Sequence, residues 1–199
     1  MSVYFYIPNL IGYARVICAL VFCYTGSFNP IVSAIVYSVS QLGDLFDGMA
    51  ARKFNQCSVF GSVLDMVTDR FSNACLLAVL YKLYPTIGFL FLWALALDLC
   101  SHWYQMYSTL YCNEKHHKTA VSKYKILEIY YKVPYMLFFM VLLSETAMVT
   151  LYLNVFIDWF VIQILMYVSV PFLCLKHYIN FIQLISASDK IIEKEQNKF

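Results

Sequence analysis

Six apolar stretches, each long enough to cross a bilayer as an α-helix, constrain this chain more than any other feature. Only 13% of the 199 residues are charged and 61% are hydrophobic, whereas soluble domains carry about 25% charged residues. A hydrocarbon core about 30 Å thick needs roughly 20 helical residues. We therefore predict an all-α polytopic membrane protein with six transmembrane helices, at approximately 10–27, 30–50, 58–81, 85–111, 133–152 and 155–178.

The distribution of positive charge predicts the orientation of these helices. Most of the 14 Lys and Arg residues follow the second, fourth or sixth stretch, and such residues concentrate on the cytosolic side of membranes. With an even number of spans, both termini should also lie there. We expect a transmembrane domain over residues 1–185 and a charged cytosolic tail over 186–199. The net charge of +2 gives no indication of nucleic-acid binding.

Four aspartates interrupt the apolar pattern around the connection between the second and third stretches. Asp44 and Asp47 are three residues apart, and Asp65 and Asp69 are four apart. Residues at these spacings share a helix face, and the short connection 52–58 makes the two helices antiparallel neighbours. An ionised carboxylate at membrane depth is costly unless it is paired or bound to a cation. We therefore predict that the four carboxylates converge on Mg²⁺ or Mn²⁺, because these cations prefer oxygen ligands.

Two other interpretations of the aspartates explain the sequence less well. Solvated charges at the membrane interface would account for scattered acidic residues, but not for two face-sharing pairs on either side of one short turn. A cation transporter or channel would use them as a selectivity site. It would also need polar residues along a continuous path, and the last two stretches offer little beyond Glu145 and Asp158, near the opposite end. A binding or catalytic site open to the cytosol is favoured.

Two glycines and an arginine accompany the aspartates. Gly48 and Gly61 remove side chains where a ligand could approach the backbone, although small residues also serve helix packing in lipid. Arg52, one turn after Gly48, is a natural partner for a phosphate. Since Mg²⁺ usually takes substrate phosphates as further ligands, the pattern favours a phosphate-bearing substrate.

The spacing of these residues resembles the signature of the CDP-alcohol phosphatidyltransferase family. That signature, D-x-x-D-G-x-x-A-R-x8-G-x-x-x-D-x-x-x-D, specifies eight positions, and the sequence departs from none of them. Three further segments resemble members that use inositol as the acceptor: PNLIGYAR from Pro8, LDMVTDR from Leu64 and SHW from Ser101. The resemblance covers most of residues 4–135, and the last two stretches match in character only.

The resemblance implies a reaction and a role for each signature residue. The phosphatidyl group of CDP-diacylglycerol would pass to myo-inositol, giving phosphatidylinositol and CMP. Asp44, Asp47, Asp65 and Asp69 would hold one or two Mg²⁺ or Mn²⁺ ions, and Asp69 would also act as general base. The residues implied to bind CDP-diacylglycerol are Gly48, Ala51, Arg52, Ser58 and Gly61. Residence in the endoplasmic reticulum and a homodimer are likewise implied by the resemblance alone.

The acceptor alcohol stays open, because the signature specifies only the CDP-alcohol half of the reaction. Glycerol phosphate and serine are alternatives to inositol, although the scarcity of Arg outside the signature favours a neutral acceptor. Asp98 and His102, four residues apart, are candidates for acceptor binding or for support of the metal site. They could equally form a structural pair whose members satisfy each other in lipid.

Further basic residues have less specific interpretations. Arg15 lies in the first apolar stretch near its cytosolic end, so we expect its side chain to snorkel toward the interface. With Asn9, it could instead line a groove that admits lipid. The loop after the fourth stretch contains His116, His117, Lys118 and Lys123, which could contact headgroups or the acceptor. Charge that sets membrane topology explains this loop better.

Overall fold

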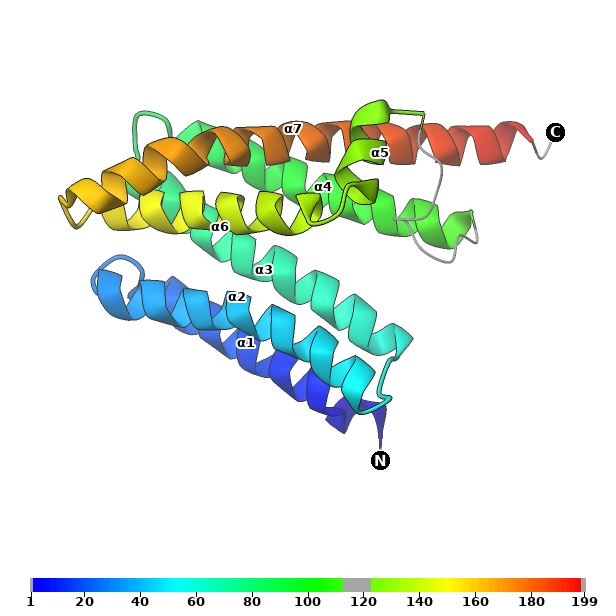
Figure 1. Cartoon of the computed structure of the whole chain (residues 1–199), viewed down its shortest axis with the longest axis horizontal. Coiled ribbons are helices and arrows are strands. Elements are labelled where there is room, and N and C mark those ends of the chain that lie inside the picture. The colour runs from blue at the N-terminus through cyan, green and yellow to red at the C-terminus, as the bar shows by residue number, and fades with distance from the viewer. Residues whose placement is uncertain (1, 113–122, 198–199) are drawn as a thin grey trace. The chain divides into compact units, whose positions relative to one another are not determined.

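A computed structural model describes residues 2–112 and 123–197. Helices form most of these residues, and no strand occurs among them. The predicted all-α class is therefore confirmed. The elements, in chain order, are the 3-10 helix η1 (Val3–Phe5) and the α-helices α1 (Ile7–Thr25), α2 (Pro30–Lys53), α3 (Val59–Leu83), α4 (Gly88–Tyr111), α5 (Lys125–Lys132), α6 (Met136–Asn154) and α7 (Phe160–Gln196) (Figure 1).

The six long helices coincide with the six predicted apolar stretches. Within the described residues, three of them are long and apolar enough to cross a membrane by length and composition: α1, α6 and α7. Large apolar side chains also remain exposed along the helices, among them Leu20 of α1, Phe89 of α4 and Phe138 of α6. Exposed apolar surface on this scale suits contact with lipid rather than water. The count of six spans stays a prediction.

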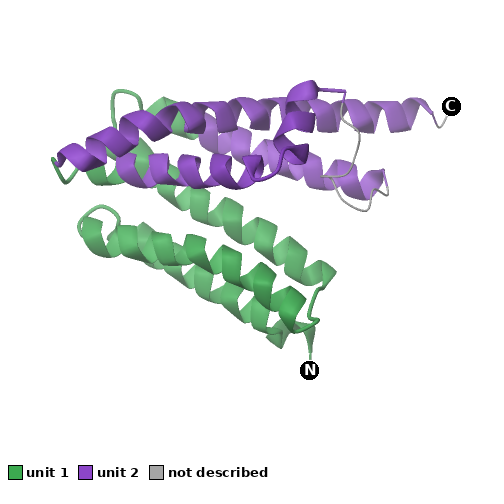
Figure 2. Ribbon diagram, in the orientation of Figure 1, with its two compact units in different colours: residues 1–92, 152–158 green, residues 93–151, 159–199 purple. Residues whose placement is uncertain are grey.

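The chain divides into two compact units (Figure 2). Unit 1 consists of Met1–Leu92 and Tyr152–Asp158, and unit 2 consists of Trp93–Leu151 and Trp159–Phe199. Helices α1, α2 and α3 lie in unit 1, together with all eight positions of the signature. The candidate site can therefore be described within unit 1 alone.

Local sequence signals set the ends of the helices that carry the signature. Asn29 caps α2, since its side-chain oxygen accepts from the N–H of Val32 at 3.3 Å, and Pro30 occupies the first position of that helix. Ser58 caps α3 in the same way, accepting from the N–H of Gly61 at 2.9 Å. Between α2 and α3, Asn55 adopts a left-handed φ of 54°, a conformation that Asn tolerates better than most residues. These signals produce a tight reversal of the chain.

An aromatic cluster and a set of polar contacts hold unit 1 together. The ring of Phe22 lies 5.5 Å from that of Tyr37 and 5.4 Å from that of Tyr152. The Tyr152 hydroxyl donates to the carbonyl of Gly26 at 2.9 Å, and the Tyr37 hydroxyl donates to the side-chain oxygen of Asn73 at 3.2 Å. Interhelical hydrogen bonds of this kind join helices in lipid, where the hydrophobic effect cannot. They fix α1, α2 and α3 as one frame for the site.

Unit 2 differs from the sequence prediction at two places. Residues Lys125–Lys132, predicted as part of a charged connection, form helix α5. Its apolar face contributes Leu127 and Tyr130 to a core with Met140 and Ile179.

Helix α7 also continues to Gln196, beyond the predicted end of the last stretch at 178. Its terminal part makes contacts of its own, since Asp189 accepts from the Tyr124 hydroxyl at 2.8 Å and Glu193 pairs with Lys123. Residues 186–196 of the charged tail are therefore helical.

Candidate functional site

The four signature aspartates converge across the seam between α2 and α3. One oxygen each from Asp44, Asp47 and Asp65 lies within 4.8 Å of the others. Asp69 lies one turn further along α3 and contacts the same arginine as the other three. The helical spacing predicted this convergence. Because every donor is a carboxylate oxygen, the cluster fits a hard divalent cation such as Mg²⁺ or Mn²⁺ better than zinc.

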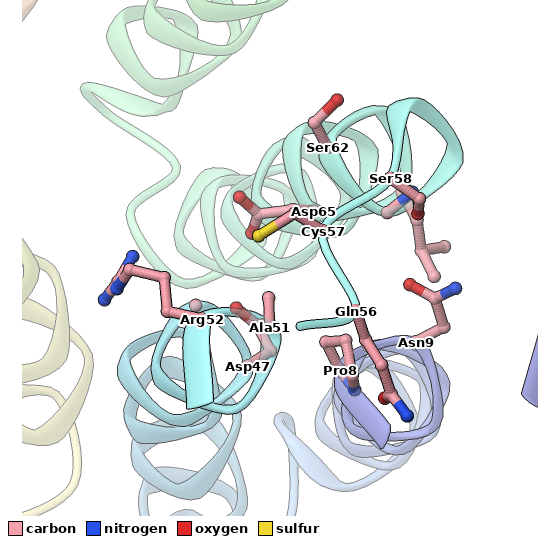
Figure 3. A pocket seen from close by; sticks show the side chains of 14 residues that line it. Pro8, Asn9, Asp47, Ala51, Arg52, Gln56, Cys57, Ser58, Ser62 and Asp65 are labelled. Atoms are coloured by element: carbon pink, nitrogen blue, oxygen red, sulfur yellow. The ribbon is translucent and has the colours of Figure 1, made fainter. Parts of the chain in front are cut away.

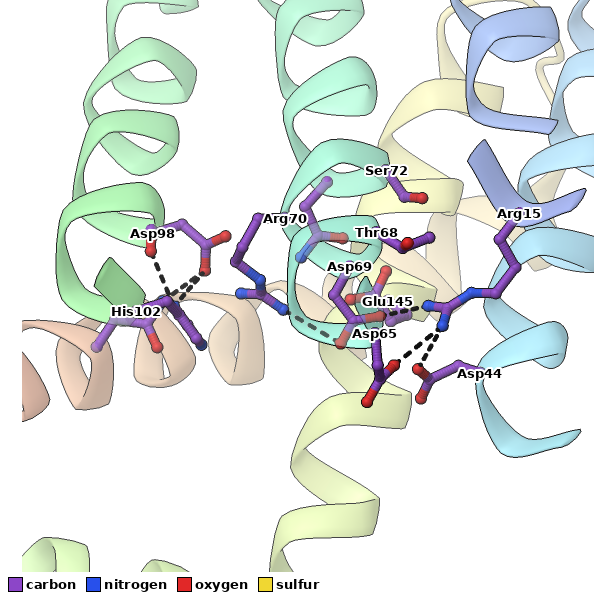
Figure 4. Close-up of polar contacts among 12 residues, drawn as sticks. Arg15, Asp44, Asp65, Thr68, Asp69, Arg70, Ser72, Asp98, His102 and Glu145 are labelled. Carbon is purple, nitrogen blue, oxygen red and sulfur yellow. Dashed lines mark hydrogen bonds and ion pairs between the residues drawn. The ribbon is translucent and has the colours of Figure 1, made fainter. Parts of the chain in front are cut away.

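The side chain of Arg15, from α1, enters the middle of this cluster. Figure 4 shows Asp44, Asp65 and Asp69 pointing toward its guanidinium. The Nη1 atom lies 3.0 Å from Asp44, 2.8 Å from Asp47 and 3.1 Å from Asp65, and Nη2 contacts Asp69. Only 2% of the side chain is exposed. A buried guanidinium is thus paired with four carboxylates.

This placement shows that the expected snorkelling of Arg15 toward the interface is wrong. Several carboxylates that converge in an apolar surrounding attract a cation strongly, because an unpaired charge there is costly. The position of Arg15 in its own helix gave no sign of this partner set, since the aspartates lie on two later helices. Arg15 is the main element of the site that sequence reasoning missed.

Helix α2 is shaped to receive the stem of Arg15. The Arg15 Nε donates to the carbonyl of Ser40 at 3.1 Å, and the Ser40 hydroxyl donates to the carbonyl of Arg15 at 3.3 Å. At Gly43, an added Cβ would lie only 2.9 Å from Arg15 Cγ. The lack of a side chain at Gly43 therefore allows α1 and α2 to approach with the arginine between them.

A cavity of about 190 Å³ opens beside the aspartates (Figure 3). Asp47 and Asp65 form part of its wall, which joins it to the carboxylate cluster. The five residues that the resemblance assigns to CDP-diacylglycerol also line it: Gly48, Ala51, Arg52, Ser58 and Gly61. Residues of the signature thus line one cavity, and the carboxylates of Asp47 and Asp65 form part of its wall.

The two signature glycines differ in how closely other atoms surround them. At Gly61 an added Cβ would lie 3.0 Å from the side-chain oxygens of both Asn9 and Ser58. At Gly48 the nearest atom would be Arg52 Nη1 at 3.5 Å, an ordinary contact. Gly61 therefore permits close packing of α1 against α3, whereas Gly48 leaves room beside the guanidinium of Arg52.

Residues of α1 and of the α2–α3 connection complete the wall of the cavity. Pro8 and Asn9 line it from α1, and Gln56 and Cys57 line it from the connection. The Gln56 side-chain oxygen accepts from the N–H of Ile7 at 2.8 Å, which ties the connection to the start of α1. The segment PNLIGYAR had been singled out only by resemblance. The spacing of residues could not predict that this segment lines the cavity, because the segment is distant in sequence from the signature.

Asp98 and His102 lie in unit 2 and make contacts there. Asp98 accepts from the side-chain amide of Asn180 at 2.9 Å, and its carboxylate lies 3.6 Å from His102 Nδ1. The Asp98 side chain is 3% exposed. The two side chains therefore lie close together, and their role stays a prediction. His116, His117 and Lys118 lie outside the described residues.

Comparison with known proteins places the chain in a family. The model of the CDP-alcohol phosphatidyltransferase family matches residues 5–177. The chain belongs to the CDP-alcohol phosphatidyltransferase family. Members of this family generally depend on a divalent metal, and the cluster of Asp44, Asp47 and Asp65 could bind one. Family membership and the three apolar helices together indicate an integral membrane protein.

Several relatives are named CDP-diacylglycerol–inositol 3-phosphatidyltransferase. The one from Candida albicans is 38% identical over 188 residues, which cover 94% of this chain and 82% of the relative. The one from Homo sapiens is 36% identical over 194 residues, which cover 94% and 91%. The one from Schizosaccharomyces pombe is 44% identical over 153 residues, which cover 76% of this chain and 65% of the relative. No solved structure matches the chain.

Proposed function

We propose that this protein transfers the phosphatidyl group of CDP-diacylglycerol to myo-inositol, giving phosphatidylinositol and CMP. The observation that carries the proposal is the cavity of about 190 Å³ whose wall combines the signature residues with two carboxylates of the aspartate cluster. The inositol acceptor is supported by the relatives named CDP-diacylglycerol–inositol 3-phosphatidyltransferase, whose alignments cover 94% to 100% of the chain.

Asp44, Asp47, Asp65 and Asp69 are proposed to hold one or two divalent cations, Mg²⁺ or Mn²⁺. The all-carboxylate donor set supports this, and so does the closeness of three of the donors. When bound, the metal would neutralise the diphosphate and stabilise the charge on departing CMP.

Residues of the cavity wall are proposed to orient the diphosphate. The Arg52 guanidinium offers several donors in a fork that matches phosphate oxygens. The Ser58 oxygen accepts from the N–H of Gly61, which leaves its hydroxyl hydrogen able to donate to a phosphate. The start of α3 has no acidic residue in its first turn, so its N–H groups also favour an anion there. The wall that faces the diphosphate is therefore rich in donors.

Asp69 is proposed to act as general base. An inositol hydroxyl is a poor nucleophile near neutral pH, and a carboxylate that takes its proton during attack makes it a better one. The inositol oxygen then bonds to the phosphorus of the phosphatidyl group, and the bond from that phosphorus to the CMP oxygen breaks. CMP leaves with the electron pair, and the proton resides on Asp69.

The position in the membrane forms a finer part of the proposal. We infer that α1, α2, α3, α4, α6 and α7 all span the membrane of the endoplasmic reticulum, with the site and both termini in the cytosol. Arg52 and Lys53 at the end of α2 support this orientation. Residues 1–185 would form the catalytic domain of a homodimer, followed by the charged tail 186–199. Asp98 and His102 remain candidates for acceptor binding or for support of the metal site.

An acceptor comparison tests the proposed reaction most directly. The purified protein in detergent would receive CDP-diacylglycerol, Mg²⁺ or Mn²⁺, and either myo-inositol, glycerol phosphate or serine, with CMP release as the readout. We expect release with myo-inositol. Faster release with another alcohol would make the protein a sibling transferase. Cation flux in vesicles without CMP release from any alcohol would favour a transporter.

A further inference from the structure

Arg15 holds a position in unit 1 that neither the signature nor the reaction explains. A single nitrogen, Nη1, contacts one oxygen each of Asp44, Asp47 and Asp65 at 2.8–3.1 Å. These are the same three residues whose oxygens lie close enough to share one cation. The guanidinium nitrogen therefore lies where a metal ion would meet its ligands.

We propose that Arg15 is a positioning residue, a resident counter-ion that keeps the aspartates converged while no metal is bound and that a divalent cation must displace. The inference rests on the proposed metal site. Carboxylates that approach one another this closely repel unless a positive charge lies between them. In this structure the guanidinium supplies that charge from inside the chain, so the ligands stay gathered before the metal arrives.

Contacts with helix α2 hold the Arg15 side chain in this position. Its Nε is held by the carbonyl of Ser40 at 3.1 Å, and its stem passes over Gly43, where a Cβ would lie 2.9 Å from Cγ and 3.1 Å from Cδ. The side chain is almost fully buried. Because Nη2 contacts Asp69 separately, the contacts through Nη1 can be given up while the one to Asp69 is kept.

Two positive charges cannot occupy the same position, so the Arg15 guanidinium and a metal ion would compete for the same three carboxylates. Removing the guanidinium should destabilise the metal-free protein, since the carboxylates lose their counter-ion, and should also tighten metal binding. A purely structural arginine would give the opposite result for the metal, because its loss would scatter the ligands. The sign of the change in affinity therefore distinguishes the two roles.

The experiment compares the wild type with Arg15→Gln as full-length protein in detergent. Thermal unfolding in EDTA reports the metal-free state, and the electron paramagnetic resonance signal of free Mn²⁺ reports the Kd for Mn²⁺. For Arg15→Gln we expect a lower Tm in EDTA, a larger rise in Tm on adding Mn²⁺, and a Kd lower by about tenfold or more. An unchanged or higher Kd in a variant that remains folded would overturn the inference.

Three further variants make the comparison specific. Gly43→Ala keeps the charge but displaces the Arg15 stem, so it should shift Tm and Kd in the same directions and serves if Arg15→Gln does not fold. Arg70→Gln removes an arginine that lies 3.7 Å from Asp69 and should tighten Mn²⁺ binding less. Lys82→Gln removes an exposed charge at the far end of α3 and should leave the Kd unchanged. An equal change in Kd for Arg15→Gln, Arg70→Gln and Lys82→Gln would overturn the inference.

The result also separates failure of this inference from failure of the proposed function. If the wild type binds no Mn²⁺ and releases no CMP, the metal-dependent transferase itself is refuted. If the wild type binds Mn²⁺ and releases CMP, but Arg15→Gln binds the ion no more tightly, only the role of Arg15 is refuted.

Discussion

At the scale of single residues, the functions proposed for the aspartates depend on their charge rather than on their shape. Asp47 and Asp65 both contact Arg15 and both line the cavity, yet the side chain of Asp47 is buried whereas that of Asp65 is about half exposed. Asparagine has nearly the same shape as aspartate and no charge. Substitutions between the two can therefore test the chemistry of the site while leaving its packing in place.

Asp69→Asn should abolish transfer while the protein still inserts and folds. Loss of a positioned general base costs about 10²- to 10⁴-fold in rate, and loss of a metal ligand would add to that. CMP release measures the rate, and size-exclusion elution with circular dichroism reports the fold. Turnover at the wild-type rate would refute the assignment of Asp69 as base.

Arg52→Gln should raise the KM for CDP-diacylglycerol. A hydrogen bond to a charged group contributes about 1.5–3 kcal/mol, which corresponds to roughly tenfold or more in affinity. Arg52→Lys is the matched control, because it keeps the charge and loses the fork of donors; we expect an intermediate KM. Equal KM values for all three proteins would show that Arg52 does not contact the diphosphate.

At the scale of elements, the apolar pattern predicted the helices and the spacing of the aspartates predicted their convergence. Each of these depends on residues close in sequence. The ends of elements were harder to predict: α7 continues past the last apolar stretch, and its Glu193 pairs with the distant Lys123. The burial of Arg15 among the aspartates was missed because these aspartates lie on two later helices. The hydropathy pattern does not predict which side chains of one helix contact those of another.

The signature glycines should differ in what they tolerate. In Gly61→Ala the new methyl group would lie 3.0 Å from two side-chain oxygens on α1 and the connection, so we expect a loss of stability of about 1–3 kcal/mol. Gly48→Ala would place its methyl group at an ordinary contact distance and should affect the KM for CDP-diacylglycerol more than Tm. Thermal unfolding of both variants tests this order. A Tm lower for Gly48→Ala than for Gly61→Ala would contradict it.

At the scale of the whole molecule, the proposed orientation follows from charge and from the number of spans. Arg52 and Lys53 lie at the end of α2, next to the α2–α3 connection, whereas Lys82 lies at the other end of α3. If α3 crosses the membrane, these two positions face opposite sides. The exposed Cys57 lies in the connection and provides a natural probe of its side.

Labelling of single cysteines in sealed microsomes should show this orientation. A variant that keeps only Cys57 should react with a membrane-impermeant maleimide without permeabilisation, because the connection is expected in the cytosol. A variant that keeps only a cysteine introduced by Lys82→Cys should react after permeabilisation alone. Labelling of both positions in intact vesicles would exclude α3 as a span.

All the residues that line the cavity lie between Pro8 and Asp65, within the first third of the chain. The proposed nucleotide-binding site is therefore encoded by one contiguous part of the sequence, and most of the polypeptide lies outside it. Relatives that share a liponucleotide but differ in the alcohol they modify could diverge in the later helices without rebuilding that block. Exchanging those helices between relatives is thus the natural route to a new product.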